Sequence, residues 1–134
     1  MRCLLLLFFI PVISANWYSV KARVVCDNRH YNGFAAMTVN YWGIGGLGDY
    51  ERFPIEIVDG WLKATIDSPS GWVIYSYHIE IPHECSCPKN TVHNIDKDDE
   101  KILNRYRSKE DAEEHTFFIG VINLNNDCPG FITE

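Results

Sequence analysis

The sequence predicts an all-β domain, an antiparallel β-sandwich of about seven short strands with a short helical segment before the last strand. About seven runs of alternating or β-branched and aromatic residues are separated by turn sequences every 8 to 12 residues or so, a spacing typical of sandwiches. The chain has 134 residues, a length that allows one domain. Its composition, 46% hydrophobic and 22% charged, excludes a disordered or low-complexity protein.

The first fifteen residues are predicted to be a secretory signal peptide, cut after Ala15. A positive start at Arg2 precedes an apolar run, Leu4–Ile13, which is shorter than the roughly 20 residues needed to cross a bilayer. The mature domain, residues 16–134, would then hold 11 basic and 18 acidic side chains, a net charge of −7. We therefore expect a secreted, extracellular protein with no transmembrane segment.

The first half of the mature chain holds three expected strands. Val20–Cys26 alternates apolar and polar residues, and Ala35–Trp42 resumes this pattern after the polar turn Asp27–Gly33. The glycine-rich loop Gly43–Gly48 interrupts the chain. Phe53–Val58 is the third strand, with a proline near its start, where strands tolerate it.

Asp59-Gly60 predicts a tight hairpin turn between the third strand and a return strand, Trp61–Ile66. After the turn Asp67–Gly71, the long run Trp72–Ile81 is expected to form a strand that ends before Pro82. The second half of the chain thus begins with a hairpin and a long strand.

The last part of the chain combines strands with helical turns. Thr91–Ile95 is a possible short strand, and one or two helical turns are expected between Asp98 and Glu114. Ser108-x-x-Asp111 is close to a capping box, which marks the start of a helix. Thr116–Leu124 is the expected final strand.

Four cysteines remain after export: Cys26, Cys85, Cys87 and Cys128. An even number in a secreted chain predicts two disulfides. Cys85 and Cys87 are separated by one residue, so their side chains point to opposite faces of an extended segment and are unsuited to a mutual bridge. Two pairings remain open, 26–85 with 87–128 and 26–87 with 85–128.

The run Gly43–Gly48 spells G-x-G-x-x-G after a strand, as in dinucleotide-binding loops. Such a site needs a helix that opens at the last glycine, and Pro54 follows too soon for a crossover helix. A loop that joins two strands is the better interpretation.

Two further sequences resemble metal sites, but neither supports a metal or cofactor. His83–Cys87 offers ligands at every second position, with His78 or His93 nearby in sequence, yet thiols in an oxidising compartment are expected to pair. Asp96–Glu100 lacks the glycine and the bidentate glutamate of an EF-hand loop. We expect no bound metal.

Charge and loop composition indicate binding rather than catalysis. A net charge of −7 excludes nucleic acid and favours a basic extracellular protein or a small molecule over an anionic membrane, unless a local patch at Lys21, Arg23 and Arg29 decides otherwise. No nucleophile, base and orienting group stand at recognisable spacing, so we expect no catalytic residues. Loops at the ends of a rigid scaffold commonly carry binding residues. The candidates are Asp27, Arg29, His30 and Tyr31 in one loop and Gly43, Gly45, Gly46 and Gly48 in the other.

The ordered segments resemble the nematode transthyretin-like family of secreted proteins. Val20–Cys26 is similar to the family's opening strand, Met37–Tyr41 to its second strand and Ile66–Trp72 to its threonine-aspartate-x-x-glycine turn. Glu80–Cys85 looks like the family's lysine-isoleucine-tyrosine-histidine-x-cysteine segment, with Pro82 in place of the tyrosine, and Phe118–Leu124 looks like its final strand.

The resemblance implies a transthyretin-like β-sandwich and a disulfide between Cys26 and Cys85, the two cysteines shared with the family, which leaves Cys87 for Cys128. It also implies a secreted, non-enzymatic binding protein that acts at cell surfaces or in extracellular fluid. A carrier of a small apolar ligand is the alternative. A third hypothesis is an enzyme like the hydroxyisourate hydrolases that share the fold. Those end in Tyr-Arg-Gly-Ser, and this chain ends Gly130–Glu134.

Overall fold

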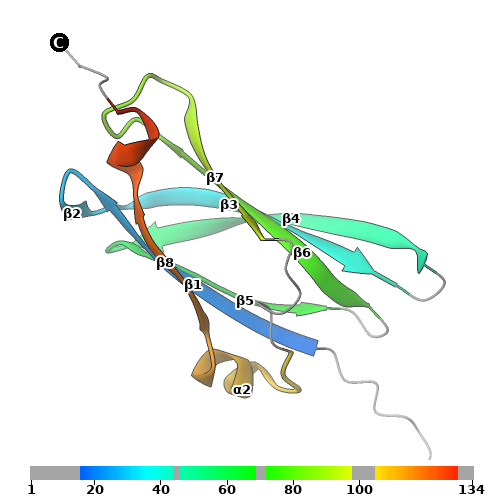
Figure 1. Ribbon diagram of the computed structural model, residues 1–134. Coiled ribbons are helices and arrows are strands. Elements are labelled where there is room, and N and C mark those ends of the chain that lie inside the picture. The colour runs from blue at the N-terminus through cyan, green and yellow to red at the C-terminus, as the bar shows by residue number, and fades with distance from the viewer. Residues whose placement is uncertain (1–15, 44–45, 69–71, 98–104, 130–134) are drawn as a thin grey trace, which may run out of the picture.

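Strands dominate the molecule. In the computed structural model, which describes residues 16–43, 46–68, 72–97 and 105–129, eight strands form one sheet that curls until its halves face each other (Figure 1). The strand order is β2-β1-β5-β4-β3-β6-β7, and β8 pairs with β1 outside this path. The bounds are β1 (Asn16–Cys26), β2 (Arg29–His30), β3 (Gly33–Trp42), β4 (Gly48–Val58), β5 (Trp61–Ser68), β6 (Val73–His83), β7 (Thr91–Lys97) and β8 (Phe117–Asn123).

The two halves of the sheet are joined along one side only. Strands β4 and β5 pair at Ile57 with Leu62 and at Val58 with Trp61, and beyond this hairpin end they belong to different halves. One half contains β1, β5 and β8, and the other contains β3, β4, β6 and β7. The all-β class is therefore confirmed, and the layers are two parts of one curled sheet.

The antiparallel prediction is wrong for the last strand. β8 lies parallel to β1, with Val20 beside Phe117 and Val24 beside Ile122. All other strand pairs are antiparallel. The chain leaves the second half at β7 and returns to the first half by way of helix α2 (Lys109–Glu114). Because β8 does not follow its neighbour in the sheet through a tight hairpin, it is not constrained to run antiparallel to that neighbour.

The core lies between the two halves and is built from the inward faces of all the long strands. Tyr18 on β1 reaches across it, and its hydroxyl accepts a 3.3 Å hydrogen bond from the backbone N–H of Ile74 on β6. Most members of the buried apolar cluster alternate along their strands, as the period of a half-buried strand requires. They are Tyr18, Val20, Ala22, Val24, Ala35, Met37, Val39, Tyr41, Ile55, Ile57, Leu62, Ala64, Ile74, Tyr77, Ile79, Ile81, Cys85, Ile95, Ile122 and Leu124.

Burial also changes the acidity of four tyrosines. Loss of solvent raises the pKa of Tyr77 to about 12. The same cause raises the pKa values of Tyr18, Tyr31 and Tyr41, and a hydrogen bond to Glu51 adds to the effect at Tyr41. Neutral tyrosine is thus favoured at all four positions by the fold.

Two hairpins turn at residues with positive φ. Asp59 (φ 51°) and Gly60 (φ 78°) join β4 to β5, which confirms the predicted turn. Asp27 (φ 52°) and Asn28 (φ 60°) join β1 to β2, at the start of the predicted turn Asp27–Gly33. Positive φ at both central residues matches the twist of antiparallel strands, which explains why short polar residues and glycine stand there.

The strand limits set by the two prolines are wrong. Pro54 lies in the middle of β4 opposite Ala36, and Pro82 lies within β6 opposite Val92. At Pro54, β4 pairs only with β3, and at Pro82, β6 pairs only with β7. Each proline therefore sits where its strand has a free edge, and the missing N–H breaks no ladder.

Helix α2 confirms part of the predicted helical segment; residues 98–104 of that segment lie outside the described residues. The Oγ of Ser108 accepts a 3.1 Å hydrogen bond from the backbone N–H of Asp111, as its capping position predicts. Ala112 faces the sheet and is fully buried. The helix packs on β1 and β5 near the start of β8 (Figure 1).

Candidate functional site

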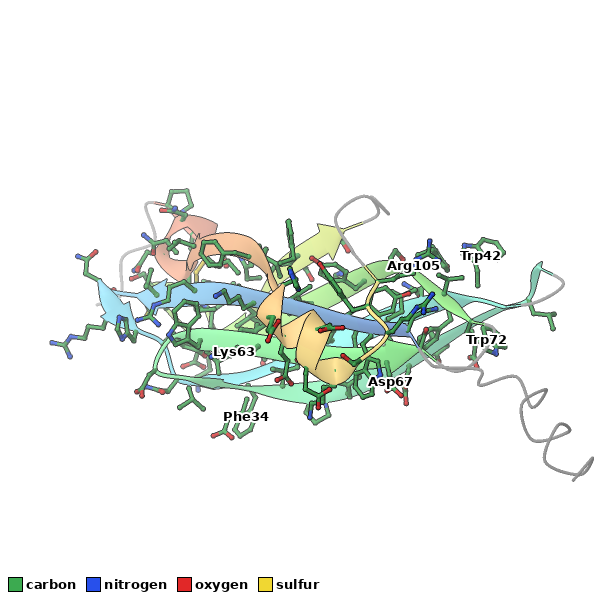
Figure 2. All side chains as sticks on the ribbon, turned by 90° about the horizontal axis from the view of Figure 1, so that it is seen from below. Phe34, Trp42, Lys63, Asp67, Trp72 and Arg105 are labelled. Carbon is green, nitrogen blue, oxygen red and sulfur yellow. A yellow bond between two sulfur atoms is a disulfide. The ribbon has the colours of Figure 1, made fainter. Side chains whose placement is uncertain are left out.

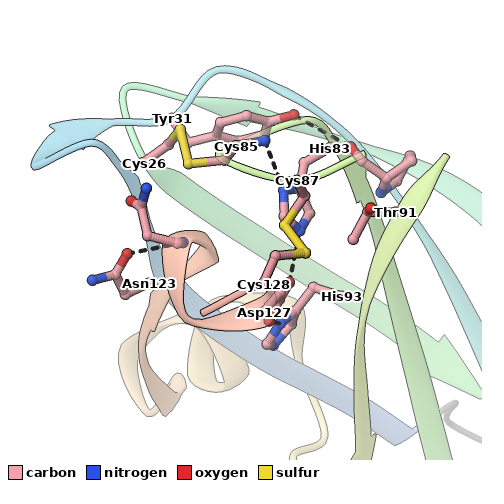
Figure 3. Close-up of polar contacts among 12 residues, drawn as sticks. Cys26, Tyr31, His83, Cys85, Cys87, Thr91, His93, Asn123, Asp127 and Cys128 are labelled. Carbon is pink, nitrogen blue, oxygen red and sulfur yellow. Dashed lines mark hydrogen bonds and ion pairs between the residues drawn. A yellow bond between two sulfur atoms is a disulfide. The ribbon is translucent and has the colours of Figure 1, made fainter. Parts of the chain in front are cut away.

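Two disulfides fasten one end of the sheet (Figure 3). Cys26 at the end of β1 is bonded to Cys85 after β6, and Cys87 is bonded to Cys128 after the 3-10 helix η2 (Leu124–Asp127). The predicted pairing is confirmed and the alternative, 26–87 with 85–128, is excluded. The bridges join both halves of the sheet at this end.

A carboxylate with two histidines reinforces the same end. Asp127 accepts from His83 Nε2 at 2.6 Å and from His93 Nδ1 at 2.7 Å, one bond to each oxygen (Figure 3). The Nδ1 of His83 accepts a 3.1 Å bond from the backbone N–H of Cys85, so the proton of this fully buried ring lies on Nε2. The cluster ties η2 to β6 and β7.

The histidines and cysteines whose spacing in the sequence resembles a metal site make other contacts in the structure. His83 and His93 meet at Asp127, whereas His78 lies between Glu80 and Asp96. Cys26, Asp27 and Cys85 bring possible ligand atoms within 4.8 Å of one another, but both sulfurs belong to a disulfide. A bridged sulfur has no thiolate to offer a metal.

Asp27, a predicted binding residue, serves as an anchor. Its backbone N–H donates to Asn125 Oδ1 at 2.7 Å, and Asn125 Nδ2 donates back to Asp27 Oδ1 at 2.8 Å and to Ser86 Oγ at 2.9 Å. These bonds hold the β1–β2 turn against η2 and the loop after β6. They engage the backbone N–H and the Oδ1 of Asp27.

The other residues of this predicted loop are divided in their roles. The hydroxyl of Tyr31 donates to the carbonyl of Pro82 at 3.3 Å, and its ring lies over Gly33, where a Cβ would come within 2.8 Å of it. Arg29 and His30 are exposed on β2 and line an open depression beside Cys26. A binding role for the residues of this loop stays a prediction.

The two predicted loops lie at opposite ends of β3. That strand has 10 residues, which separates its ends by about 30 Å. Gly48 pairs with Trp42 across the β3–β4 turn, and strand β4 follows in place of the helix that a dinucleotide site needs. A Cβ at Gly43 would meet the Trp72 ring at 2.7 Å, so packing explains that glycine. Gly45 lies outside the described residues, and a binding role for Gly46 and Gly48 stays a prediction.

A cluster of cations lies on the outer face of β1 and β5. Arg23 Cζ is 4.5 Å from the centre of the Trp61 ring, Lys21 Nζ is 5.5 Å away and Lys63 Nζ is 5.7 Å away. The register produces this arrangement, because Arg23 stands opposite Trp61 and Lys21 stands opposite Lys63. We call these four residues the cationic face. The negative face of an indole ring attracts cations and offsets part of their mutual repulsion.

The cationic face is electrically unbalanced. Among the described residues, no carboxylate is in an ion pair with Lys21, Arg23 or Lys63, in a chain whose net charge is −6. Arg23 Nη2 donates instead to the His30 ring, at 3.0 Å from Nδ1, which brings exposed β2 to the border of the face. Its field therefore remains available for an anionic partner.

The outer face of the other half differs, because its charged side chains contact one another. Arg52 Nη1 lies 2.9 Å from Glu80 Oε1, which lies 3.3 Å from His78 Nε2, and His78 contacts Asp96. The hydrogen bond from Arg52 holds the pKa of Glu80 below its usual value. Phe34 projects from this face (Figure 2) and is 63% exposed.

Sequence reasoning found half of the cationic face. It named Lys21, Arg23 and Arg29 as a local patch, and the first two do lie together, with Arg29 on the adjoining β2. It missed Trp61 and Lys63, although their alternation with buried Leu62 and Ala64 marks an outward face.

Comparison with known proteins finds no family model, curated protein or solved structure that matches this chain.

Proposed function

We propose that this chain is a secreted, non-enzymatic binding protein of the transthyretin-like type, and that it binds an anionic extracellular partner through the cationic face. One observation carries the proposal: three cations gather within 5.7 Å of the Trp61 ring centre, and none is in an ion pair with a described carboxylate. Buried cations that serve stability are normally paired, whereas unpaired cations at an open surface suit a ligand.

The compartment is supported by the disulfides and the N-terminal segment. Two bridges persist in oxidising surroundings, which is where secreted proteins work. Among the described residues, none of the helices has the length and apolar character to cross a membrane. The aromatic side chains of Tyr18, Tyr41 and Tyr77 belong to the packed core, which favours a surface-binding protein over a carrier with an internal cavity.

Export is tested by expressing the full chain in secreting eukaryotic cells. The intact mass of the secreted protein should correspond to a chain that starts at Asn16, within a residue or two. Retention of residues 1–15 would contradict the signal peptide.

Binding is tested with purified mature protein and two anionic probes, a sulfated oligosaccharide and a polyglutamate peptide. At least one should bind, and Lys63→Glu should weaken binding, while Lys89→Glu, the same charge change at an exposed lysine in the β6–β7 connection, should not. Failure of both probes to bind folded protein would refute the anionic-partner function. Turnover of hydroxyisourate, a peptide or an ester would refute the non-enzymatic one.

A further inference from the structure

We infer that the anionic partner is a linear polysaccharide that carries sulfate or carboxylate groups, and that one of its sugar units occupies a depression beside the cationic face. This inference rests on the proposed function and names the class of its partner. Three features of the surface carry it: a recess lined with hydroxyls, the lysines at its rim and exposed apolar side chains on β8.

The recess lies between helix α2 and the outer face of β1 and β5. It has a volume of about 400 Å³ and is lined by Ser19, Lys21, Lys63, Thr65, Glu113 and Thr116. The hydroxyls form a chain, with Ser19 Oγ 2.7 Å from Thr116 Oγ1 and 3.3 Å from Thr65 Oγ1. Hydroxyls both donate and accept, so this lining matches the hydroxyls of a sugar ring.

The charges at the recess are arranged for a saccharide with anionic substituents. Lys21 and Lys63 stand opposite each other at its rim, where their ammonium groups would meet sulfates or carboxylates. Glu113 on α2 is the single carboxylate in the lining, and its oxygens accept hydrogen bonds from sugar hydroxyls. Arg23 lies two residues farther along β1, about 7 Å from Lys21, so the cations form a row that suits a repeating polyanion.

Apolar side chains flank the row on its other side. Phe118 stands beside Lys21 and Val121 stands beside Arg23 on β8, with 46% and 66% of their surfaces exposed. The C–H faces of sugar rings are weakly positive and apolar, and they stack well on the negative face of an aromatic ring. The surface therefore presents cations, hydroxyls and apolar contacts in neighbouring strips.

The same surface suits acidic peptides and membranes less well. β1 is paired on one side with β5 and on the other with β8, so a peptide strand cannot pair with the backbone of β1 itself, which carries Lys21 and Arg23. Trp61 is half-buried beneath the cations, which prevents it from inserting into a bilayer.

The experiment compares four probes on mature protein by calorimetry or fluorescence: a size-defined heparin oligosaccharide, its desulfated counterpart, polyglutamate of similar length and phosphatidylserine vesicles. The sulfated oligosaccharide should bind most tightly. Lys63→Glu should weaken binding of the sulfated oligosaccharide about tenfold and reduce its salt dependence by at least about a third, since one of three cations is lost and a carboxylate is added. Lys89→Glu should leave both unchanged.

The recess is tested separately with Thr65→Val, which removes a hydroxyl and keeps the side-chain shape. Its affinity for the oligosaccharide should fall severalfold, and its affinity for polyglutamate should stay the same. Circular dichroism and the unfolding midpoint confirm that each variant is folded.

Equal affinity for polyglutamate and the sulfated oligosaccharide would overturn the polysaccharide inference while the anionic-partner function survives. Exclusive binding to vesicles, or an unchanged oligosaccharide affinity in Thr65→Val, would also overturn it. Absence of binding to every probe would remove the proposed function itself.

Discussion

Tyr77 is predicted to lower stability through its hydroxyl, so Tyr77→Phe should stabilise the protein. The side chain lies on β6 in the core and is 1% exposed, and its hydroxyl has no hydrogen-bond partner among the described residues. In the unfolded chain water satisfies this hydroxyl, whereas in the fold no group of the described residues replaces the lost hydrogen bond. Phenylalanine keeps the buried ring and removes the unpaired group.

The expected gain follows from two opposing contributions. Removing an unsatisfied buried hydroxyl returns about 1–3 kcal/mol. The missing oxygen leaves a gap smaller than a methyl group, which costs up to about 1 kcal/mol in lost contacts. The free energy of unfolding should therefore rise by about 1 kcal/mol, which for a domain of this size raises the unfolding midpoint by about 3–5 °C.

Tyr41→Phe is the matched control, because it makes the same chemical change at another core tyrosine. The hydroxyl of Tyr41 donates to Glu51 Oε2 at 2.9 Å, so its loss should cost about 1 kcal/mol. Urea and thermal unfolding of both variants, followed by circular dichroism, provide the measurement. A Tyr77→Phe variant as destabilised as Tyr41→Phe would refute the reasoning, since it would show that the Tyr77 hydroxyl has a partner.

Three further predictions concern the bridges, the β4–β5 turn and alkaline pH. The double variant Cys87→Ser/Cys128→Ser should lose about 4 kcal/mol of unfolding free energy in denaturant titrations, as expected for a bridge that spans 41 residues, and a loss below about 1 kcal/mol would contradict this. Gly60→Ala should cost about 1–3 kcal/mol, because Gly60 has φ 78° and a Cβ there would lie 2.9 Å from the Val24 carbonyl; an unchanged unfolding midpoint would argue against strain. Burial raises the pKa of Tyr77 from 10.0 to about 12, so the folded protein holds this proton more tightly than the unfolded chain does. The free energy of unfolding should therefore be unaffected by this group below pH 10 and should fall as the pH rises toward 12. Ultraviolet titration of tyrosinate should show the four buried tyrosines ionising late, and a single transition near the ordinary pKa would exclude this.

Local patterns in the sequence account for the strands that the structure confirms. Alternation identified β1 and β3, and Asp59-Gly60 identified the turn between β4 and β5, because both depend on residues close in sequence. The direction of β8 depends instead on where the chain re-enters the sheet after β7. The strand limits predicted at Pro54 and Pro82 were wrong for a similar reason. Whether a proline ends a strand depends on which edge of that strand is paired, and the local sequence does not show this.

The cationic face shows how one pattern fixes both core and surface. The period of two that buries Ala22 and Val24 also sends Lys21 and Arg23 outward, and this much was readable from the sequence. The sequence could not show that Trp61 lies opposite Arg23, because 38 residues separate them and only the β1–β5 register brings them together. That register is itself strongly determined, since a slip of one residue would bury the cations and expose the core. The selection of a stable core therefore also places the cations around the indole ring, and substitutions that shift the β1–β5 register should abolish anion binding and stability together.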